Sequence, residues 1–240
     1  MALCLAISAA LAVAPQARAA TGSTVAPMHE GSIAMSVTTD RSHGPQKVDV
    51  EIKGSRLRCD LPASASAEHQ PLQAVVDMAR QRVVLVMPAQ SAYAVLDMNQ
   101  VPPESRQDAE RRLAEEASRW TAVRTGTQKT IAGHRCNTWE ARDDKTGRRI
   151  DACLAPDVRL DFDAILPPSM LPPSWTDKLK NGELPLAATV YDASGKVTFH
   201  EQVTRVQLRT VADSRFEPPA GYKRVDLPLS SFGSLLPLPQ

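Results

Sequence analysis

The feature that most constrains this chain is a central stretch of alternating residues and turn signals, Thr121–Asp163. Two short segments interrupt it, Ala132-Gly133 and Asp143–Gly147. Both contain residues that adopt turn conformations which β-branched residues resist. The runs between them follow the two-residue period of β-strands. The stretch therefore predicts consecutive antiparallel strands joined by tight turns, with a cysteine on each arm of one hairpin.

The register of this hairpin depends on where its turn is centred. A turn centred between Asp144 and Lys145 places Cys136 opposite Cys153. A bulge at Gly147 shifts that register by a residue or more, and this alternative stays open. The first register also predicts these cross-strand neighbours: Thr138 with Asp151, Glu140 with Arg149 as an opposite-charge pair, and Trp139 with Ile150 on the core side.

The first twenty residues predict export. Met1–Ala20 is mostly Ala and Leu and contains Ala17-Arg18-Ala19, a small-residue pattern that precedes signal-peptide cleavage. We interpret residues 1–19 as a signal peptide cleaved near Ala19-Ala20, with a buried helix as the alternative, and expect a periplasmic protein. Residues 20–30 are small and polar and predict a disordered leader. No later stretch approaches the length of a membrane-spanning helix.

In an oxidising compartment the cysteines predict one disulfide. Cys136 and Cys153 stand on the two arms of one hairpin, and a bond between them would fix its register. Cys59 is then left over, either as a small buried apolar side chain or as a free or intermolecular thiol. His134 and Cys136 share a strand face, but no second ligand pair stands at metal spacing, so no metal is expected.

Outside the central stretch the pattern is mainly β with one helix. Residues 103–120 have a helical period and a thin apolar stripe of Ala109, Leu113, Ala117 and Trp120. We interpret this segment as a surface helix that lies on a sheet, with a movable lid as the alternative. Period-two runs predict the strands Gly31–Thr39, Lys47–Ile52, Arg56–Asp60, Gln73–Met78, Arg82–Met87, Ser91–Met98 and Leu186–Tyr191, and a strand pair at 196–209.

The segment Ala164–Leu179 combines two Pro-Pro pairs with large apolar side chains. Proline excludes a regular strand or a long helix here, so the segment either covers the edge of the core or contacts a ligand. Residues 227–240 are apolar but rich in Pro and Ser and predict a flexible tail, which leaves residues 31–226 as the folded β domain. The candidate ligand-binding residues are Ile165, Leu166, Met170, Leu171, Trp175 and Leu113.

Composition and motifs exclude several function classes. The formal net charge is +1 without a basic cluster, so nucleic-acid binding is not expected. Aromatic residues make up 4% of the chain, too few for a platform that stacks bases or sugars. The chain has no nucleophile elbow, no zinc-protease motif and no phosphate-binding glycine loop. We therefore expect no cofactor and do not expect an enzyme.

The order of four motifs resembles a bacterial family of exported proteins of unknown function, the domain of unknown function 4412 type. The motifs are KVDVEIKGSRLRCDL, VVDMARQRVVLVMPAQSAYAVLDM followed by one charged helix, TGTQKTIAGHRCNTWEA and FEPPAGYK. The resemblance covers roughly Gly31–Lys223, and that family is itself similar to the periplasmic lipoprotein-carrier (LolA/LolB-like) half-barrels. This chain departs from them in its proline-rich segment Ala164–Trp175 and in its low aromatic content.

The resemblance implies a mainly β fold (α+β), a curved antiparallel sheet or half-barrel. One main helix and a short helical or proline-rich segment would lie over its open face. In the carriers an apolar cavity holds acyl chains. The leading hypothesis is therefore a periplasmic binding or carrier module for a lipid or acylated chain. The alternatives are a non-catalytic envelope interaction or scaffold protein whose sheet is filled by its own side chains and, third, an enzyme of unknown type.

Overall fold

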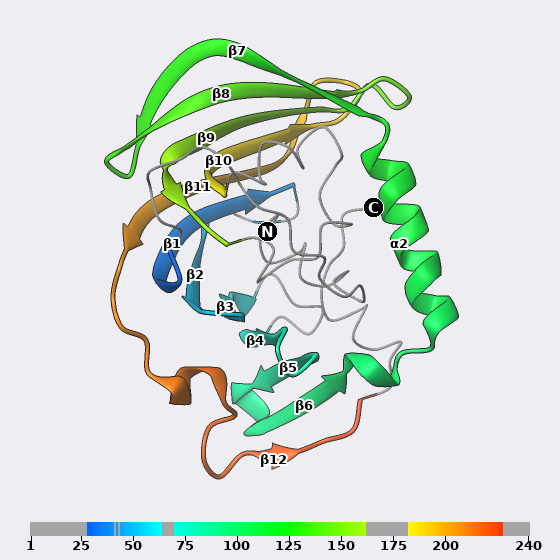
Figure 1. Ribbon diagram of the computed structural model, residues 1–240, viewed down its shortest axis with the longest axis vertical. Helices are drawn as coiled ribbons and strands as arrows, with labels where there is room; N and C mark the ends of the chain where they lie inside the picture. The colour runs from blue at the N-terminus through cyan, green and yellow to red at the C-terminus, as the bar shows by residue number, and fades with distance from the viewer. Residues whose placement is uncertain (1–27, 41, 43, 64–69, 162–181, 228–240) are drawn as a thin grey trace.

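The computed structural model describes residues 28–40, 42, 44–63, 70–161 and 182–227. Five side chains of the helix also lie outside this description: Arg106, Ala109, Glu110, Leu113 and Ala117. The described residues form a curved sheet, one α-helix and three short 3-10 helices (Figure 1). The strands are β1 (Glu30–Thr39), β2 (Gln46–Lys53), β3 (Arg56–Leu61), β4 (Leu72–Asp77), β5 (Arg82–Met87), β6 (Ala92–Asp97), β7 (Trp120–Ile131), β8 (His134–Asp143), β9 (Arg149–Arg159), β10 (Glu183–Tyr191), β11 (Val197–Gln207) and β12 (Lys223–Arg224). The helices are η3 (Pro88–Gln90), η4 (Met98–Gln100), α2 (Pro103–Ala117) and η6 (Asp213–Phe216).

All twelve strands belong to one sheet, in the order β12-β6-β5-β4-β3-β2-β1-β11-β10-β9-β8-β7. Every pairing is antiparallel except that of β12 with β6. The sheet bends into an arch that does not close, with β12 and β7 as its two edges (Figure 1). The predicted mainly β, curved antiparallel sheet is therefore confirmed. Residues 196–209, predicted as a pair of strands, instead form the single long strand β11.

Alternation along the strands gives the arch an apolar inner face. On β1 the inward residues are Ile33, Met35 and Val37, and the same period continues across β2 to β6. The inward residues of those five strands are Val48, Val50, Ile52, Leu57, Cys59, Leu61, Leu72, Ala74, Val76, Val83, Leu85, Met87, Ala92 and Ala94. Because successive side chains point to opposite faces, the outer faces of the same strands are left for polar residues and for a second, smaller apolar cluster.

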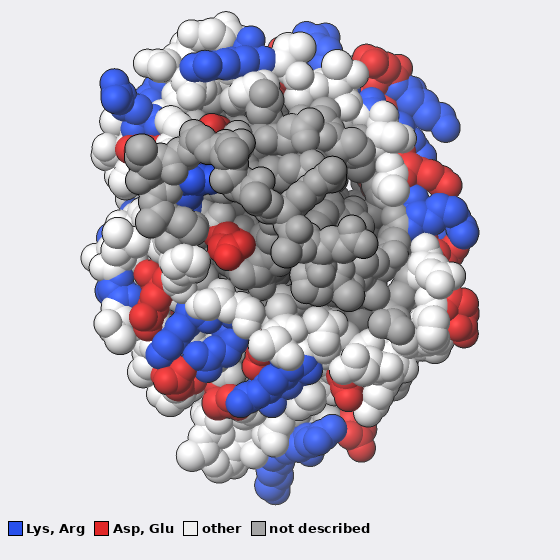
Figure 2. Space-filling model, viewed as in Figure 1, with Lys and Arg blue, Asp and Glu red and all other residues white. Residues whose placement is uncertain are grey.

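Helix α2 connects β6, beside one edge of the sheet, to β7 at the other edge. It starts after Pro102 and ends at Ala117, three residues earlier than predicted. Trp120 is the first residue of β7, where it is buried under the guanidinium of Arg148, so it is not part of a helical stripe. Asp108 and Arg112, one helical turn apart, form an ion pair at 2.9 Å. Figure 2 shows acidic and basic side chains alternating along this side of the molecule.

The central hairpin joins β8 to β9, but its register is two residues away from the first predicted one. Thr138, not Cys136, lies opposite Cys153. Glu140 consequently faces Asp151 rather than Arg149. Its ion pair is instead with Arg142, two residues along the same strand, at 2.7 Å. That hydrogen bond from Arg142 lowers the pKa of Glu140. In the same way, Trp139 faces Ala152 and Ile150 faces Ala141, although Trp139 and Ile150 do pack against the core as predicted.

The side chain of Asp143 explains this register. Its Oδ1 accepts hydrogen bonds from the backbone N–H groups of Lys145 and Thr146, and its Oδ2 accepts one from the Thr146 hydroxyl at 2.6 Å. The hydrogen bond from the Thr146 hydroxyl lowers the pKa of Asp143 most, and the two backbone N–H groups lower it further. Gly147 follows with φ +73°, and the turn closes between Asp143 and Arg148. The turn is therefore centred one residue later than Asp144–Lys145, which moves every cross-strand partner by two.

The disulfide prediction is confirmed despite this shift. Cys136 and Cys153 are bonded, with their Cα atoms 5.3 Å apart. They are diagonal neighbours across β8 and β9, which still brings them within the distance that a disulfide bridges. Cys59 is completely buried on β3, as expected of a small apolar side chain. It is also disulfide-bonded, so the prediction that leaves Cys59 outside any disulfide is wrong, both as an unbonded apolar side chain and as a free thiol.

A C-terminal segment, Arg209–Val225, crosses the outer face of β3 to β6, and we call it the C-terminal clamp. Phe216 and Val211 are each 1% exposed and form the smaller apolar cluster with Val75, Val84 and Val86. The clamp ends in β12, whose Lys223 N–H donates to the Ser91 carbonyl oxygen at 2.9 Å. The sequence did not predict a strand at this position.

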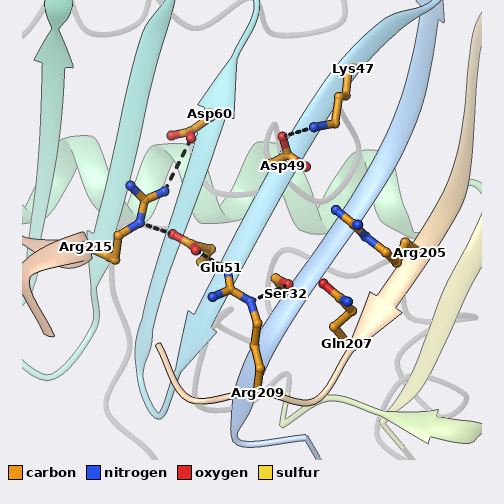
Figure 3. Close-up of a pocket in the computed structure, with 9 residues that line it drawn as sticks. All are labelled: Ser32, Lys47, Asp49, Glu51, Asp60, Arg205, Gln207, Arg209 and Arg215. Atoms are coloured by element: carbon orange, nitrogen blue, oxygen red, sulfur yellow. Dashed lines mark hydrogen bonds and ion pairs between the residues drawn. The ribbon is translucent and has the colours of Figure 1, made fainter. Parts of the chain in front are cut away.

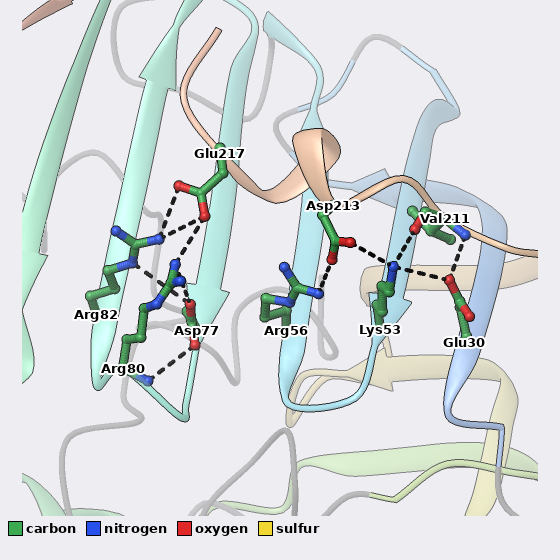
Figure 4. A network of polar contacts seen from close by, with 9 residues as sticks. All are labelled: Glu30, Lys53, Arg56, Asp77, Arg80, Arg82, Val211, Asp213 and Glu217. Atoms are coloured by element: carbon green, nitrogen blue, oxygen red, sulfur yellow. Dashed lines mark hydrogen bonds and ion pairs between the residues drawn. The ribbon is translucent and has the colours of Figure 1, made fainter.

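Ion pairs hold the clamp to the sheet (Figure 4). Asp213 binds Arg56 and, at 3.1 Å, Lys53. The hydrogen bonds from Arg56 and Lys53 lower the pKa of Asp213. The guanidinium of Arg56 also lies over the ring of Phe216, 4.8 Å from its centroid. A second group joins Glu217 to Arg80 at 2.9 Å and to Arg82 at 3.1 Å.

Candidate ligand-binding faces

The inner face of β1 to β6 carries much of the larger of the two apolar clusters formed by the described residues. Ile33, Val50, Ile52 and Leu85 are all 0% exposed, and they come from β1, β2 and β5. Met98 of η4 and Leu186 of β10 extend the same cluster beyond these strands. Such a face contributes only dispersion and the hydrophobic effect, which are non-directional and favour apolar ligands or apolar side chains.

One carboxylate lies among these apolar residues on β11. Glu201 is 6% exposed and occupies the strand position between Phe199 and Val203, both of which pack into the inner cluster. On the neighbouring strands it faces Val37 and Ala188. Sequence analysis did not single it out, although strand periodicity placed it on the same face as Phe199.

Most of the predicted ligand-binding residues lie outside the described residues. This holds for Ile165, Leu166, Met170, Leu171 and Trp175, and for the side chain of Leu113 in α2. The structure therefore does not test whether these side chains meet. The sequence predicted the strands that carry the inner face, but it did not identify this face as a possible ligand surface. The signal that could have found this face is the strict alternation on six neighbouring strands.

The outer face of β1, β2, β3 and β11 carries a depression of about 450 Å³ (Figure 3), which we call the outer groove. Glu51 is central to it, because its two oxygens accept from Arg209 and, at 2.7 Å, from Arg215. Only 8% of the Glu51 side chain is exposed. All of the residues that line the groove are polar or charged: Ser32, Lys47, Asp49, Glu51, Asp60, Arg205, Gln207, Arg209 and Arg215.

Further ion pairs fix the carboxylates of the outer groove. Asp60 accepts from Arg58 Nε at 2.8 Å and lies 3.8 Å from Arg215. Asp49 pairs with Lys47 at 2.7 Å. Sequence analysis found none of this arrangement, because it joins residues that are far apart in the chain, such as Ser32 and Arg209.

Neither a metal centre nor a transmembrane helix is found among the described residues. No group of three or more His, Cys, Asp or Glu side chains in this part of the chain could hold a metal ion. The pair of His134 and Asp157, 3.3 Å apart, has no third ligand there. The helices of the same residues are too short or too polar to cross a membrane.

Comparison with protein families places the chain in one of them. A family model described as "Domain of unknown function (DUF4412)" matches residues 29–222, from the residue before β1 to the residue before β12. The chain belongs to this family. The resemblance inferred from the four sequence motifs is thus confirmed, and the family covers the sheet together with most of the C-terminal clamp.

Solved structures with partial similarity include three proteins of low sequence identity. An uncharacterized conserved protein from Thermus thermophilus has 10% identity and a TM-score of 0.49, covering 83% of this chain and 91% of that one. A chain of the Pseudomonas aeruginosa MucA/MucB complex has 10% identity and a TM-score of 0.39, covering 80% and 56%. A putative outer membrane lipoprotein-sorting protein domain from Vibrio parahaemolyticus has 7% identity and a TM-score of 0.25, covering 80% and 91%. No curated protein matches this chain.

Proposed function

We propose that this protein is a periplasmic binding or carrier module that holds an apolar ligand, a lipid or an acylated chain, against the inner face of its sheet. The observation that carries the proposal is the apolar inner face of β1 to β6. From Ile33 to Val37 on β1, from Val48 to Ile52 on β2, and across β3 to β6, the inward residues named above are all apolar. The proposed role is non-catalytic.

The energetics of such a face suit an acyl chain. Each methylene group moved from water onto it contributes about 0.8 kcal/mol, so a long chain gains enough to bind without any specific polar contact. The ligand class is therefore set by the length and apolarity of the chain.

The proposal gives α2 and the proline-rich segment a role at the open side of the arch. The helix links the two ends of the sheet, so its movement would open or close the inner face. The apolar side chains of Ile165, Leu166, Met170, Leu171, Trp175 and Leu113 are proposed to contact the ligand from that side.

The test is native mass spectrometry of protein purified from the periplasm, followed by organic extraction of the same sample. The expected result is a co-purifying apolar molecule that leaves on extraction. Ala94→Leu adds volume on the inner face and should reduce ligand occupancy. Val95→Leu is the matched control, because it also enlarges a side chain, at the next residue of β6 and on the opposite face. Circular dichroism confirms that both variants remain folded.

Export is a part of the proposal with its own test. If residues 1–19 are a signal peptide, mature protein from the periplasm starts at Ala20 or within a few residues of it. Sequencing of the N-terminus decides this. An intact Met1 on folded protein in the cytoplasm would contradict a periplasmic carrier, whatever the outcome of the ligand experiment.

A second candidate is an envelope interaction or scaffold protein whose sheet is filled by its own side chains. The observation in its favour is that the inner-face residues have almost no exposed surface, with Ile33 and Leu85 at 0%. In that case the purified protein carries no extractable ligand, and Ala94→Leu destabilises the fold through overpacking without any ligand to displace. The mass-spectrometry experiment separates the two candidates directly.

A further inference from the structure

The outer groove is a consequence of side-chain size along β1. Ser32 lies between Glu51 of β2 and Gln207 of β11, and on the same outer face Ala34 lies between Asp49 and Arg205. Small side chains on the central strand, flanked by long ones on both neighbours, leave a channel along β1. The floor of the groove is thus built into the register of three strands, and the C-terminal clamp adds Arg209 and Arg215 to its lining.

The carboxylates of the groove are already neutralised by neighbouring cations. Glu51 accepts from two arginines, Arg209 and Arg215, through its two separate oxygens. Asp60 is shared between Arg58 and Arg215, and Asp49 is paired with Lys47. Counting Arg58 with the lining residues, five cations stand against three carboxylates, which leaves a formal excess of two positive charges.

Several guanidinium donors of the groove remain available. Arg205 makes no hydrogen bond or ion pair with any residue in the described ranges, so all five of its N–H groups are unused there. Arg209 donates through Nε to the Ser32 hydroxyl at 3.0 Å and through one Nη to Glu51, which leaves its other Nη without a described partner. These donors border one depression, as Figure 3 shows.

The groove is also held in place before any ligand arrives. Glu51 fixes two of its arginines, and it is itself almost completely shielded from water. Arg58, whose side chain is 8% exposed, donates to the backbone carbonyl oxygen of Arg215 at 2.9 Å and so ties η6 to β3. Arginines fixed by a buried acceptor lose less conformational entropy when they bind a ligand than free ones do.

We propose that the outer groove binds a phosphate group, either of a soluble phosphate ester or of a phospholipid headgroup. A tetrahedral oxyanion offers acceptors in several directions, which suits guanidinium donors that border a cavity from different strands. The volume accommodates phosphate with a small polar substituent, and the lining offers no apolar wall for a larger body. This site lies on the opposite face of the sheet from the proposed apolar ligand and is independent of it.

The experiment is a titration of isotopically labelled full-length protein, followed by NMR, with inorganic phosphate and then glycerol 3-phosphate, at an ionic strength matched with chloride. We expect saturable changes in the chemical shifts of Arg205 and Arg209. Arg205→Gln should weaken the affinity about tenfold, because it removes one charge-assisted interaction. Because Arg205 makes no hydrogen bond or ion pair with any residue that the structure describes, this substitution should leave the fold intact. Arg135→Gln, an exposed arginine of β8, is the matched control and should leave the affinity unchanged.

A second arm identifies the source of the phosphate. Sedimentation with phosphatidylglycerol vesicles is compared with sedimentation with neutral vesicles made anionic by oleate. Binding to phosphatidylglycerol that Arg205→Gln abolishes supports a headgroup ligand, whereas binding of soluble phosphate esters alone supports a soluble one. The proposal is overturned if neither binds, if Arg205→Gln weakens binding to oleate vesicles as much as binding to phosphatidylglycerol, or if Arg205→Gln binds phosphate and phosphatidylglycerol like the unmodified protein.

Discussion

The two faces of β1, β2 and β3 differ completely, although the same strands build both. On β2, Val48, Val50 and Ile52 point inward and are almost fully buried. Lys47 and Asp49 alternate with them and point outward to the groove. Glu51 also points outward, yet it is buried, because arginines from a different part of the chain cover it.

The difference between the faces lies in how each is specified. The inner face needs only apolar residues of suitable size at alternate positions, since the hydrophobic effect has no direction. The outer face needs particular neighbours, because an ion pair between Glu51 and Arg209 requires that β1, β2 and the start of the clamp meet in one register. On the inner face, a substitution should therefore change the stability of the protein according to whether it introduces a polar side chain. On the outer face, the effect should depend on which single residue is replaced.

The largest expected effect is on the inner face. Val50→Asp places a charge without a partner at a position that is 0% exposed, and should destabilise the protein by about 4 kcal/mol or more. Asp49→Asn, the next residue on the outer face, should change the stability by no more than about 0.5 kcal/mol. Urea unfolding followed by circular dichroism measures both. Similar stabilities for the two variants would remove the contrast between the faces.

A somewhat smaller effect is expected where the outer face is apolar. Phe216→Ala empties the cluster beneath the C-terminal clamp and should cost about 3–4 kcal/mol, since the ring is 1% exposed. Leu208→Ala is the control, because Leu208 is 76% exposed just before the clamp and its loss should be nearly neutral. Thermal unfolding of both variants tests the point. If Phe216→Ala unfolds like the unmodified protein, the clamp does not stabilise the sheet.

The smallest effect concerns the ion pairs of the clamp. The folded-state pKa of Asp213 lies below its ordinary value because Arg56 and Lys53 bind it. Its contribution to stability is therefore complete above the unfolded pKa of about 3.9 and is lost as the pH falls through the lower folded value. Hydrogen exchange of the clamp at pH 3 should be faster, relative to the sheet, than at pH 6.

Asp213→Asn is the control for this pH dependence. The variant should show weaker protection of the clamp already at pH 6 and a smaller further loss on acidification. An acid response as large as that of the unmodified protein would assign the effect to other carboxylates, with Glu217 as the next candidate, since its ion pairs with Arg80 and Arg82 accompany a lowered pKa despite the opposing effect of burial.

The sequence predicted the local features of the fold and missed those that depend on contacts between distant residues. The strands from β1 to β6 followed from alternation alone, as Val48, Val50 and Ile52 illustrate. The Cys136–Cys153 bond was found although the register was not, because the two Cα atoms are still 5.3 Å apart in the observed register, within disulfide range. The register itself is set by the hydrogen bonds of the Asp143 side chain. Counting residues on either side of the predicted turn does not reveal these bonds.

The candidate sites were predicted to a smaller extent. The residues of the outer groove come from β1, β2, β3, β11 and the C-terminal clamp, so no local motif joins them. Phe216 entered the sequence analysis only as the first residue of the motif FEPPAGYK, whereas it anchors the clamp on strands that lie far from it in the sequence. The apolar inner face was visible as a pattern, but only the curved sheet gathers its six strands into one surface.

The most direct test of the central claim is methyl NMR of the protein with a spin-labelled long-chain fatty acid. Strands β4 and β5 carry methyl groups on both faces, with Val76 and Leu85 inside and Val75 and Val84 outside. Binding on the inner face predicts saturable broadening of the Val76 and Leu85 signals while those of Val75 and Val84 stay sharp. Equal broadening of both pairs, or none in the presence of excess fatty acid, would contradict an apolar ligand site on the inner face.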